Sequence, residues 1–317
     1  MRYAVRNVPA VLLRKFDFFE GEFLGKRLLF IINPVSGLRL GNLYASKISG
    51  IFSADGYDVF TMFTAKRGDA EKWAFEYGEK FDMIVACGGD GTFNEAVSGN
   101  LKGAKRPLGY IPCGSTNDFA SSLGLSSDIV TAAGNIVKGT PHKFDIGLFG
   151  ERVFTYVSSF GAFTKASYTA PQNVKNVIGH LAYIFEGGAE LANIHPEHIS
   201  LEADGKVYED NYLFGAVSNS TSVGGILSIS SEQVDMNDGV FEVMLIKNPD
   251  NLSDLSKIIH AITTQQFENC DKIEFFPANK ITVLKNPEGG WSLDGEFEQG
   301  ADGAVIENIH SAIEVVY

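Results

Sequence analysis

The chain has 317 residues, of which 44% are hydrophobic and 21% charged, and this composition is typical of a folded globular protein and excludes wholesale disorder. Its net charge of -13 has the wrong sign for general nucleic-acid binding, which needs a positive field over the phosphates. Three cysteines without a Cys-x-x-Cys motif support neither a disulfide framework nor a zinc ribbon, so we expect reduced thiols and a cytoplasmic protein.

Residues 1–25 form a leader before the first predicted strand. Residues 1–15 carry no acidic side chain, and their basic side chains are Arg2, Arg6, Arg14 and Lys15. Such a segment could touch an anionic membrane surface, and the alternative is a solvated tail or an extra turn packed on the domain. Its apolar part is short and lacks a small-residue cleavage site, so we do not expect a signal peptide. No apolar run in the chain approaches the ~18–20 residues of a membrane helix.

Residues 26–143 alternate between the patterns of buried strands and of helices. Short apolar runs predict strands at 26–33, 57–63, 81–87 and 108–112. Helical spacing of apolar residues predicts helices at 42–55, 68–80 and from about residue 92. This alternation predicts an α/β domain built on a doubly wound parallel sheet, in which ligands bind beyond the carboxyl ends of the strands.

Residues 144–307 have a different sequence pattern, in which short β-rich segments are separated by turns such as Asp204-Gly205 and Asp302-Gly303. The predicted strands are 152–158, 198–203, 206–208, 211–218, 240–246, 272–276, 280–284 and 304–309. This pattern predicts a second domain that is an antiparallel β-sandwich or barrel. Two stretches, 174–193 and 251–268, look helical. A last strand at 311–317 could return to the first domain, so that residues 308–317 would complete it.

The first chemical motif is the glycine-rich loop Gly88-Gly89-Asp90-Gly91, which follows a predicted strand and precedes a helix. Adjacent glycines let backbone N–H groups approach phosphate oxygens, and the helix adds its positive N-terminus. No Lys-Ser or Lys-Thr follows, so this is not a Walker A loop. Asp90 would repel a phosphate unless a cation intervenes, which points to a Mg²⁺-nucleotide site. The alternative is a glycine turn with Asp90 as a helix N-cap.

Two further loops follow predicted strands in the same way. The segment 114–120 supplies hydroxyls and backbone donors in the run Gly-Ser-Thr-Asn before a helix, and 33–37 is the turn Asn-Pro-Val-Ser-Gly. Each loop alone could be an ordinary capped helix start or turn. Three such loops at one edge of an open sheet point to a bound nucleotide.

Acidic residues in the second domain suggest two more sites. Asp294 and Glu296 flank a glycine, and one of them could act as a general base if the turn faces the nucleotide. The segment 235–240 is rich in oxygen atoms and could bind a hard cation. The alternative for Asp294 and Glu296 is a surface turn with solvated acids, and the alternative for 235–240 is a hairpin turn at Asp238-Gly239. A further acid, Asp145, lies near the domain junction, where its ordinary role would be that of a capping or paired acid.

Taken in order, these motifs resemble the diacylglycerol kinase catalytic domain family of lipid kinases, with the likeness covering roughly residues 26–317. The resemblance implies a fold similar to diacylglycerol kinase and NAD kinase, with ATP in a cleft and the lipid site largely on the second domain. It implies ATP contacts from Asn33, Pro34, Val35, Ser36, Gly37, Thr64, Gly88, Gly89, Asp90, Gly91, Thr92, Phe93, Asn94 and Ser115.

The resemblance also assigns roles to the acidic residues. Glu296 matches the family's proton acceptor, with Asp294 beside it, while Asp90 and Asp145 would belong to the catalytic Mg²⁺ and water network. A structural Mg²⁺ site is implied at Asp235, Asp238 and Val240. This sequence departs from the family pattern in its longer leader, in Asn237 where many members have a second Asp, and in Ser115, which often is Thr.

The function implied by the resemblance is ATP- and Mg²⁺-dependent phosphorylation of a lipid hydroxyl, above all conversion of diacylglycerol to phosphatidic acid. The alternatives are another lipid acceptor, such as sphingosine, ceramide or phosphatidylglycerol, and a non-catalytic nucleotide- or lipid-binding protein. We expect a peripheral protein at the inner membrane surface that makes transient contact with its lipid substrate and does not bind nucleic acid. The sequence is compatible with a homodimer.

Overall fold

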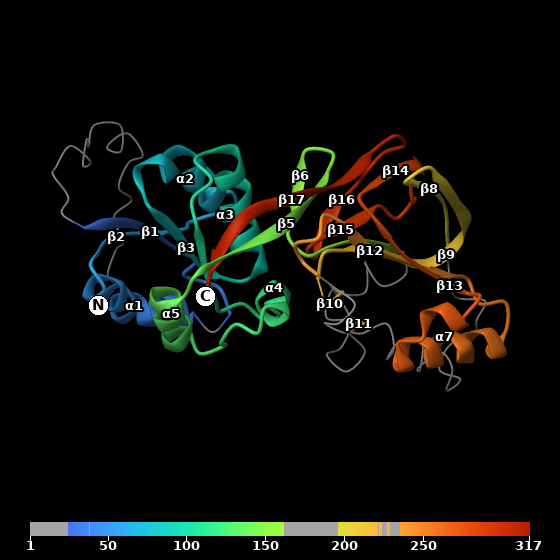
Figure 1. Ribbon diagram of the computed structural model, residues 1–317, viewed down its shortest axis with the longest axis horizontal. Coiled ribbons are helices and arrows are strands. Elements are labelled where there is room, and N and C mark those ends of the chain that lie inside the picture. The colour runs from blue at the N-terminus through green and yellow to red at the C-terminus, as the bar shows by residue number, and fades with distance from the viewer. Residues whose placement is uncertain (1–24, 38, 162–195, 221, 224–226, 229–234) are drawn as a thin grey trace, which may run out of the picture.

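The computed structural model describes residues 25–37, 39–161, 196–220, 222–223, 227–228 and 235–317. It has two lobes side by side, and the C-terminal strand runs from one into the other (Figure 1). The leader at 1–24 and the helix predicted at 174–193 lie outside the described residues.

The first lobe is a parallel sheet in the order β17-β4-β3-β1-β2. Its strands are β1 (Lys26–Ile32), β2 (Tyr57–Phe63), β3 (Met83–Gly88), β4 (Leu108–Pro112) and the end of β17 (Val305–Val316). The helices of this lobe are α1 (Leu40–Ala54), α2 (Asp69–Tyr77) with the short 3-10 turn η2 (Gly78–Lys80), α3 (Asp90–Lys102), α4 (Asp118–Ser122) and α5 (Ile129–Lys138). The predicted doubly wound sheet is confirmed.

The apolar runs of the sequence follow from helices covering both faces of this sheet. In β1, Leu28 and Phe30 belong to a buried cluster with residues of α1 and α5, while Leu29 and Ile31 belong to a cluster with residues of α2 and α3. Successive side chains of a strand point to opposite faces. Because both faces are covered, both sets must be apolar, and the strand reads as one continuous hydrophobic run.

The second lobe is an antiparallel β-sandwich, as predicted. Its strands are β5 (Pro141–Phe149), β6 (Arg152–Phe154), β7 (Val157–Gly161), β8 (Glu197–Ala203), β9 (Lys206–Ser218), β12 (Phe241–Lys247), β13 (Ile273–Ala278), β14 (Lys280–Lys285), β15 (Trp291–Leu293) and β16 (Glu296–Glu298). The short pair β10 (Ser222–Val223) and β11 (Leu227–Ser228) forms a separate hairpin. Trp291 is buried in the core, edge-on to Phe149 and Phe160. Where the sequence predicted one helix at 251–268, the structure has helix α7 (Leu252–Thr264) followed by the separate turn η7 (Phe267–Asn269).

Strand β17 connects the lobes. Its first residues pair with β14, its last residues pair with β4 in parallel, and β5 pairs with it along most of its length. The sequence predicted two strands here, at 304–309 and 311–317. The structure joins them, and the pairing register shifts between Ile309 and Ile313, where Ser311 has a left-handed φ of 50°. A bulge of this kind re-aims a strand without ending it. The predicted strands 206–208 and 211–218 likewise merge into β9.

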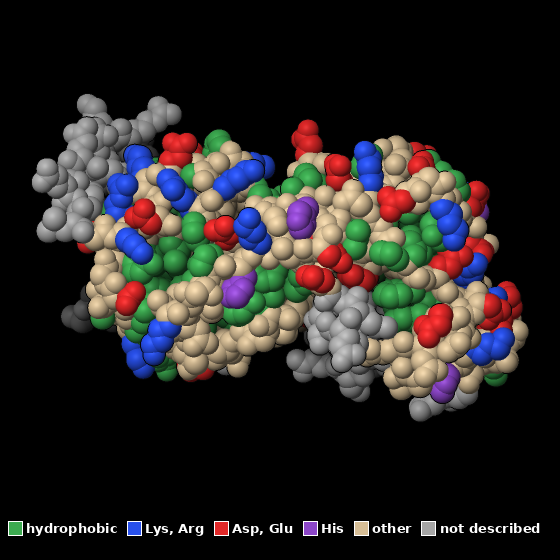
Figure 2. All heavy atoms as spheres, viewed as in Figure 1, with side chains coloured by type: hydrophobic (Ala, Val, Ile, Leu, Met, Phe, Trp, Pro, Cys, Tyr) green, Lys and Arg blue, Asp and Glu red, His purple; other side chains and the backbone are tan. Residues whose placement is uncertain are grey.

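Positive and negative side chains are interspersed over the face shown in Figure 2, on both lobes. Within the described part of the chain, no helix combines the length and the apolar character needed to cross a membrane.

Candidate active site

A cleft with a volume of ≈ 350 Å³ lies beyond the carboxyl ends of β1, β2 and β3. The predicted nucleotide-binding residues that line it are Asn33, Val35, Ser36, Thr64, Gly89, Gly91 and Thr92. Glu296 of the second lobe lines the same cleft. The structure therefore brings the glycine-rich loop, the first turn and the candidate base to one cavity.

The three loops are packed so closely that glycine is required at their contacts. A Cβ atom on Gly114 would lie 2.5 Å from the Cα of Gly89, and one on Gly89 would lie 3.2 Å from the Cα of Gly114. Gly37 has φ of 50° and lies against the backbone carbonyl of Cys113. The side chain of Asn33 donates to Thr92 Oγ1 at 3.1 Å. The loops thus form a cradle of backbone at the N-terminus of α3, which fits an anionic phosphate chain.

The remaining predicted nucleotide-binding residues lie around this cleft. Gly37 and Ser115 line a neighbouring cavity of ≈ 550 Å³, and Asn94 lines a third cavity of ≈ 280 Å³. Gly88 is the last residue of β3, and Pro34 lies in the turn after β1. The ring of Phe93 is fully buried, stacked on Tyr110 and Phe119, so its contribution is to the core of the lobe.

Asp90 is buried and its carboxylate faces the loop before α4. It accepts hydrogen bonds from Thr116 Oγ1 at 3.2 Å, from the N–H groups of Asp118 at 3.1 Å and Phe119 at 3.4 Å, and from the Tyr110 hydroxyl at 3.4 Å. Burial raises the pKa of Asp90, although these hydrogen bonds oppose the shift. The sequence allowed an N-cap role for Asp90 at the helix it begins, whereas here it caps α4 and joins two of the three loops.

The turn that contains Asp294 and Glu296 sends the two carboxylates in opposite directions. Asp294, with φ of 48°, is buried and accepts five hydrogen bonds: from Asn94 Nδ2 (2.8 Å), from the N–H (2.6 Å) and hydroxyl (2.8 Å) of Thr155, and from the N–H groups of Tyr156 (3.1 Å) and Val157 (3.1 Å). Burial raises its pKa. Asp294 therefore ties α3 to the start of β7 and positions the turn.

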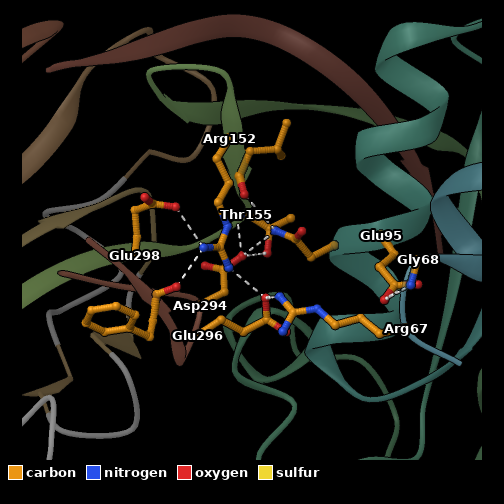
Figure 3. A network of polar contacts seen from close by, with 11 residues as sticks. Arg67, Gly68, Glu95, Arg152, Thr155, Asp294, Glu296 and Glu298 are labelled. Carbon is orange, nitrogen blue, oxygen red and sulfur yellow. Dashed lines mark hydrogen bonds and ion pairs between the residues drawn. The ribbon is translucent and has the colours of Figure 1, made fainter. Parts of the chain in front are cut away.

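The side chain of Glu296 is 37% exposed and points into the cleft, where it meets two arginines (Figure 3). Arg152 donates to Glu296 Oε2 at 2.8 Å, and Arg67 from the first lobe pairs with the same oxygen. A Cβ atom on Gly91 would lie 3.8 Å from Glu296 Oε1. The candidate base thus lies directly above the first turn of α3, where a phosphate chain would meet an acceptor.

Sequence reasoning missed Arg67, Arg152 and Glu95. Glu95 accepts from the N–H groups of Gly68 (2.8 Å) and Ala70 (3.2 Å) and so caps the start of α2. Burial is the largest cause of its raised pKa. The available signals were weak: Arg67 follows Thr64 in the same loop, and Glu95 follows the glycine-rich motif directly.

Asp145 is fully buried and lies beside the 235–240 turn. Its carboxylate accepts from the N–H groups of Gly239 (2.6 Å) and Ser311 (2.7 Å) and contacts His310 Nδ1 at 2.9 Å. Its own N–H donates to the Met236 carbonyl at 2.9 Å. Asp145 therefore fastens this turn to the bulge of β17.

The 235–240 turn has features that fit a cation. Asp235 and Asp238 are exposed, and the buried Glu242 nearby has an Oε2 atom that lacks a partner among the described residues. Burial, with a smaller contribution from the two aspartates, raises the pKa of Glu242 to about 8. Within the described residues no three His, Cys, Asp or Glu side chains are arranged to hold a metal, so a cation here would also need carbonyl oxygens such as that of Val240.

Comparisons with known proteins agree with this architecture. Residues 27–149 match the diacylglycerol kinase catalytic domain, and residues 157–317 match the YegS C-terminal NAD kinase beta sandwich-like domain. Diacylglycerol kinases from Bacillus subtilis and Staphylococcus saprophyticus are 33% and 29% identical over 294 and 292 residues. Each alignment spans 92% of this chain, and 96% and 95% of the respective relative.

Solved structures extend the comparison to the fold. Two structures from Bacillus anthracis superpose with TM-scores of 0.77 (25% identity, 94% of this chain, 97% of that chain) and 0.70 (24% identity, 93% and 97%). The second is described as a diacylglycerol kinase. With the same two lobes, the same order of motifs and a relative 33% identical over nearly the whole chain, this protein belongs to the diacylglycerol kinase family and is a lipid kinase.

Proposed function

We propose that this protein transfers the γ-phosphate of ATP to the hydroxyl of a membrane lipid in a Mg²⁺-dependent reaction, with diacylglycerol as acceptor and phosphatidic acid as product. The observation that carries the proposal is the position of Glu296, which enters from the second lobe above a cradle of glycine-rich loops. The names of the relatives support diacylglycerol as the acceptor.

On the nucleotide side, the chain supplies backbone and hydroxyl groups. Ser36, Thr64 and Thr92 line the cleft, and the N-terminus of α3 is directed at it. Mg²⁺, when bound, would neutralise charge on the phosphate oxygens. We assign Asp90 to its network through water, because the oxygens of its carboxylate already accept hydrogen bonds from the chain. The contacts of Asp145 lie instead at the 235–240 turn and the bulge of β17.

On the acceptor side, Glu296 takes the proton of the lipid hydroxyl. The hydroxyl oxygen forms a bond to the γ-phosphorus, the bond from that phosphorus to the β–γ bridging oxygen breaks, and ADP leaves with the electron pair. Arg152 orients the carboxylate, since it also donates to Glu298 at 2.9 Å and to the Phe297 carbonyl at 2.8 Å. Asp294 holds the turn from beneath. The loops and the turn together place donor and acceptor in line.

A phosphate-transfer assay with radiolabelled ATP tests the proposal. The acceptors are detergent-dispersed diacylglycerol, sphingosine, ceramide and phosphatidylglycerol, each with and without Mg²⁺. The Glu296→Gln variant should lose about 10²–10⁴-fold in kcat because it removes the proton acceptor. It should still bind ATP. Glu298→Gln, which changes a neighbouring carboxylate of the same cluster, should keep most of the activity.

Three other outcomes of this assay would change the proposed mechanism, the acceptor or the class of protein. Full activity of the Glu296→Gln variant would remove this residue from the mechanism. Transfer to another lipid alone would replace diacylglycerol as the acceptor. ATP binding without turnover on any lipid would favour a non-catalytic binding protein on the same scaffold.

A lipid acceptor requires contact with a bilayer, and we propose that this contact is peripheral and transient at the cytoplasmic membrane surface. Sedimentation with vesicles of anionic or zwitterionic phospholipid tests it. Binding to anionic vesicles that weakens with salt would support an electrostatic contribution. Absence of binding to either kind, with or without diacylglycerol in the vesicles, would contradict the proposal.

A further inference from the structure

Arg67 reaches from one lobe to the other. It lies in the loop between β2 and α2, and its side chain pairs with Glu296, 229 positions away in the sequence (Figure 3). Arg67 and Glu296 both line the ≈ 350 Å³ nucleotide cleft and the adjoining ≈ 280 Å³ cavity. Their ion pair therefore lies at the boundary between the two cavities.

The backbone that carries Arg67 is held firmly, whereas its side chain is 70% exposed. Asp69 Oδ2 accepts from the N–H groups of Ala65 (2.8 Å) and Lys66 (2.9 Å), and Glu95 accepts from those of Gly68 and Ala70. The loop is thus fixed on both sides of residue 67. A long guanidinium side chain on a fixed backbone can move between partners without a change in the fold.

The two arginines that meet Glu296 are not equivalent. Arg152 has two further acceptors, Glu298 and the Phe297 carbonyl, and remains anchored without Glu296. Among the described residues, Arg67 forms a salt bridge with Glu296 alone, and the charge of Glu95 is also close to it. A solvent-exposed ion pair of this kind contributes only ~0–1 kcal/mol, so a stronger anion can displace the carboxylate.

We propose that Arg67 is a ligand for the terminal phosphate of the bound nucleotide, and that its ion pair with Glu296 is a latch that the nucleotide opens. This inference rests on the proposed function. A guanidinium binds phosphate through paired, charge-assisted hydrogen bonds, and the terminal phosphate carries more negative charge than a carboxylate. Movement of Arg67 to the phosphate removes one of the two guanidinium groups that stabilise the ionised carboxylate of Glu296, while Arg152 continues to orient it. Glu296 then accepts the proton of the lipid hydroxyl more readily when the phosphate donor is in place.

The first test measures nucleotide affinity by calorimetry in the absence of lipid. Arg67→Gln should weaken ATP binding about tenfold, which corresponds to ~1.4 kcal/mol for a charge-assisted contact, and leave AMP binding unchanged. The matched control is Lys72→Gln, which removes an exposed positive charge from the neighbouring helix α2. That variant should bind all nucleotides within about twofold of the parent protein. An equal loss for ATP and AMP would overturn the assignment to the terminal phosphate.

The second test is a double-mutant cycle that examines the latch itself. If Glu296 competes with the phosphate for Arg67, Glu296→Gln should bind ATP about threefold to tenfold more tightly than the parent protein. This gain should disappear in the Arg67→Gln background. Glu298→Gln controls for general loss of negative charge, because Glu298 pairs with Arg152 instead. A gain that persists undiminished without Arg67 would contradict the latch.

The experiment separates this inference from the proposed function. A parent protein that binds no nucleotide would refute the proposed function first. A parent protein that binds ATP with the same affinity as the Arg67→Gln variant would refute only the inference. Thermal unfolding of the variants checks that the exposed substitutions leave the fold intact.

Discussion

Asp294 and Glu296 show how two carboxylates separated by one residue acquire different chemistry. Asp294 and Gly295 both have positive φ, so the chain reverses tightly and directs one side chain inward and the other into the cleft. The inward carboxylate meets five donors and positions the turn, while the outward one remains available for proton transfer. At the scale of single residues, function here depends on which way a side chain leaves the turn.

Asp294→Asn should therefore destabilise the protein by about 2 kcal/mol at neutral pH, because its amide nitrogen would face N–H and O–H donors that now have an acceptor. Asparagine has nearly the same shape as aspartate and tolerates a left-handed φ, so the variant differs from the parent mainly in lacking the carboxylate. Urea unfolding measures the difference. Thr155→Val, which removes one of the five donors, should lower the free energy of unfolding by less.

The pH dependence of this difference has a definite sign. Burial raises the pKa of Asp294 above its ordinary value of 3.8, so the folded protein binds this proton more tightly than the unfolded chain does. The stabilising contribution is complete below pH 3.8 and is lost as pH rises through the folded-state pKa. The difference in the free energy of unfolding between the parent and Asp294→Asn should narrow as pH rises from 3.8 through the folded-state pKa. A widening gap would mean that the five hydrogen bonds outweigh burial.

At the scale of elements, the nucleotide cleft is formed where loops that follow different strands pack against one another. The Gly89–Gly114 contact leaves no space for a Cβ atom, so the two loops approach as bare backbone. Each loop is local in sequence, and this is why residue patterns could predict all three. The prediction of a parallel sheet then placed all three loops at the same edge of that sheet, because the carboxyl ends of parallel strands lie together.

Gly114→Ala should separate these loops and weaken ATP binding about tenfold, which is the effect of ~1.4 kcal/mol of overpacking. Gly50→Ala is the matched control, because Gly50 lies in α1 with nothing within 4 Å of the added Cβ atom. That control should leave affinity unchanged and stabilise the helix by about 0.5–1 kcal/mol. Calorimetry and thermal unfolding give the two readouts. Unchanged ATP affinity in Gly114→Ala would show that the loops need not touch.

Features that depend on tertiary direction could not be predicted from local patterns. The sequence placed Asp90 in the phosphate loop but did not show that its carboxylate faces α4. The Arg67–Glu296 pair joins residues 229 positions apart, and neither residue type is unusual in its own segment. The merger of the last two predicted strands into β17 depends on Asp145 accepting the N–H of Ser311 at the bulge, a contact between distant segments.

At the scale of the whole molecule, the last residues of β17 are part of the sheet and the core of the first lobe. Val315 is fully buried and pairs with Leu108 of β4 and with His142 of β5. The N-terminal sheet is therefore incomplete until the last residues of the chain have added to it. A strand shared in this way also links the packing of the two lobes on either side of the cleft.

Val315→Ala should therefore weaken the first lobe, by about 2 kcal/mol for the buried methyl groups removed. Hydrogen exchange should show lower protection of the amides in β4 and β3 than of those in β8. Val283→Ala is the matched control, since Val283 is equally buried but pairs with Leu201 in the second lobe. It should reverse the pattern and lower protection in β8 and β14. If Val315→Ala left β4 unaffected, the last strand would be an appendage and not a member of the nucleotide-binding sheet.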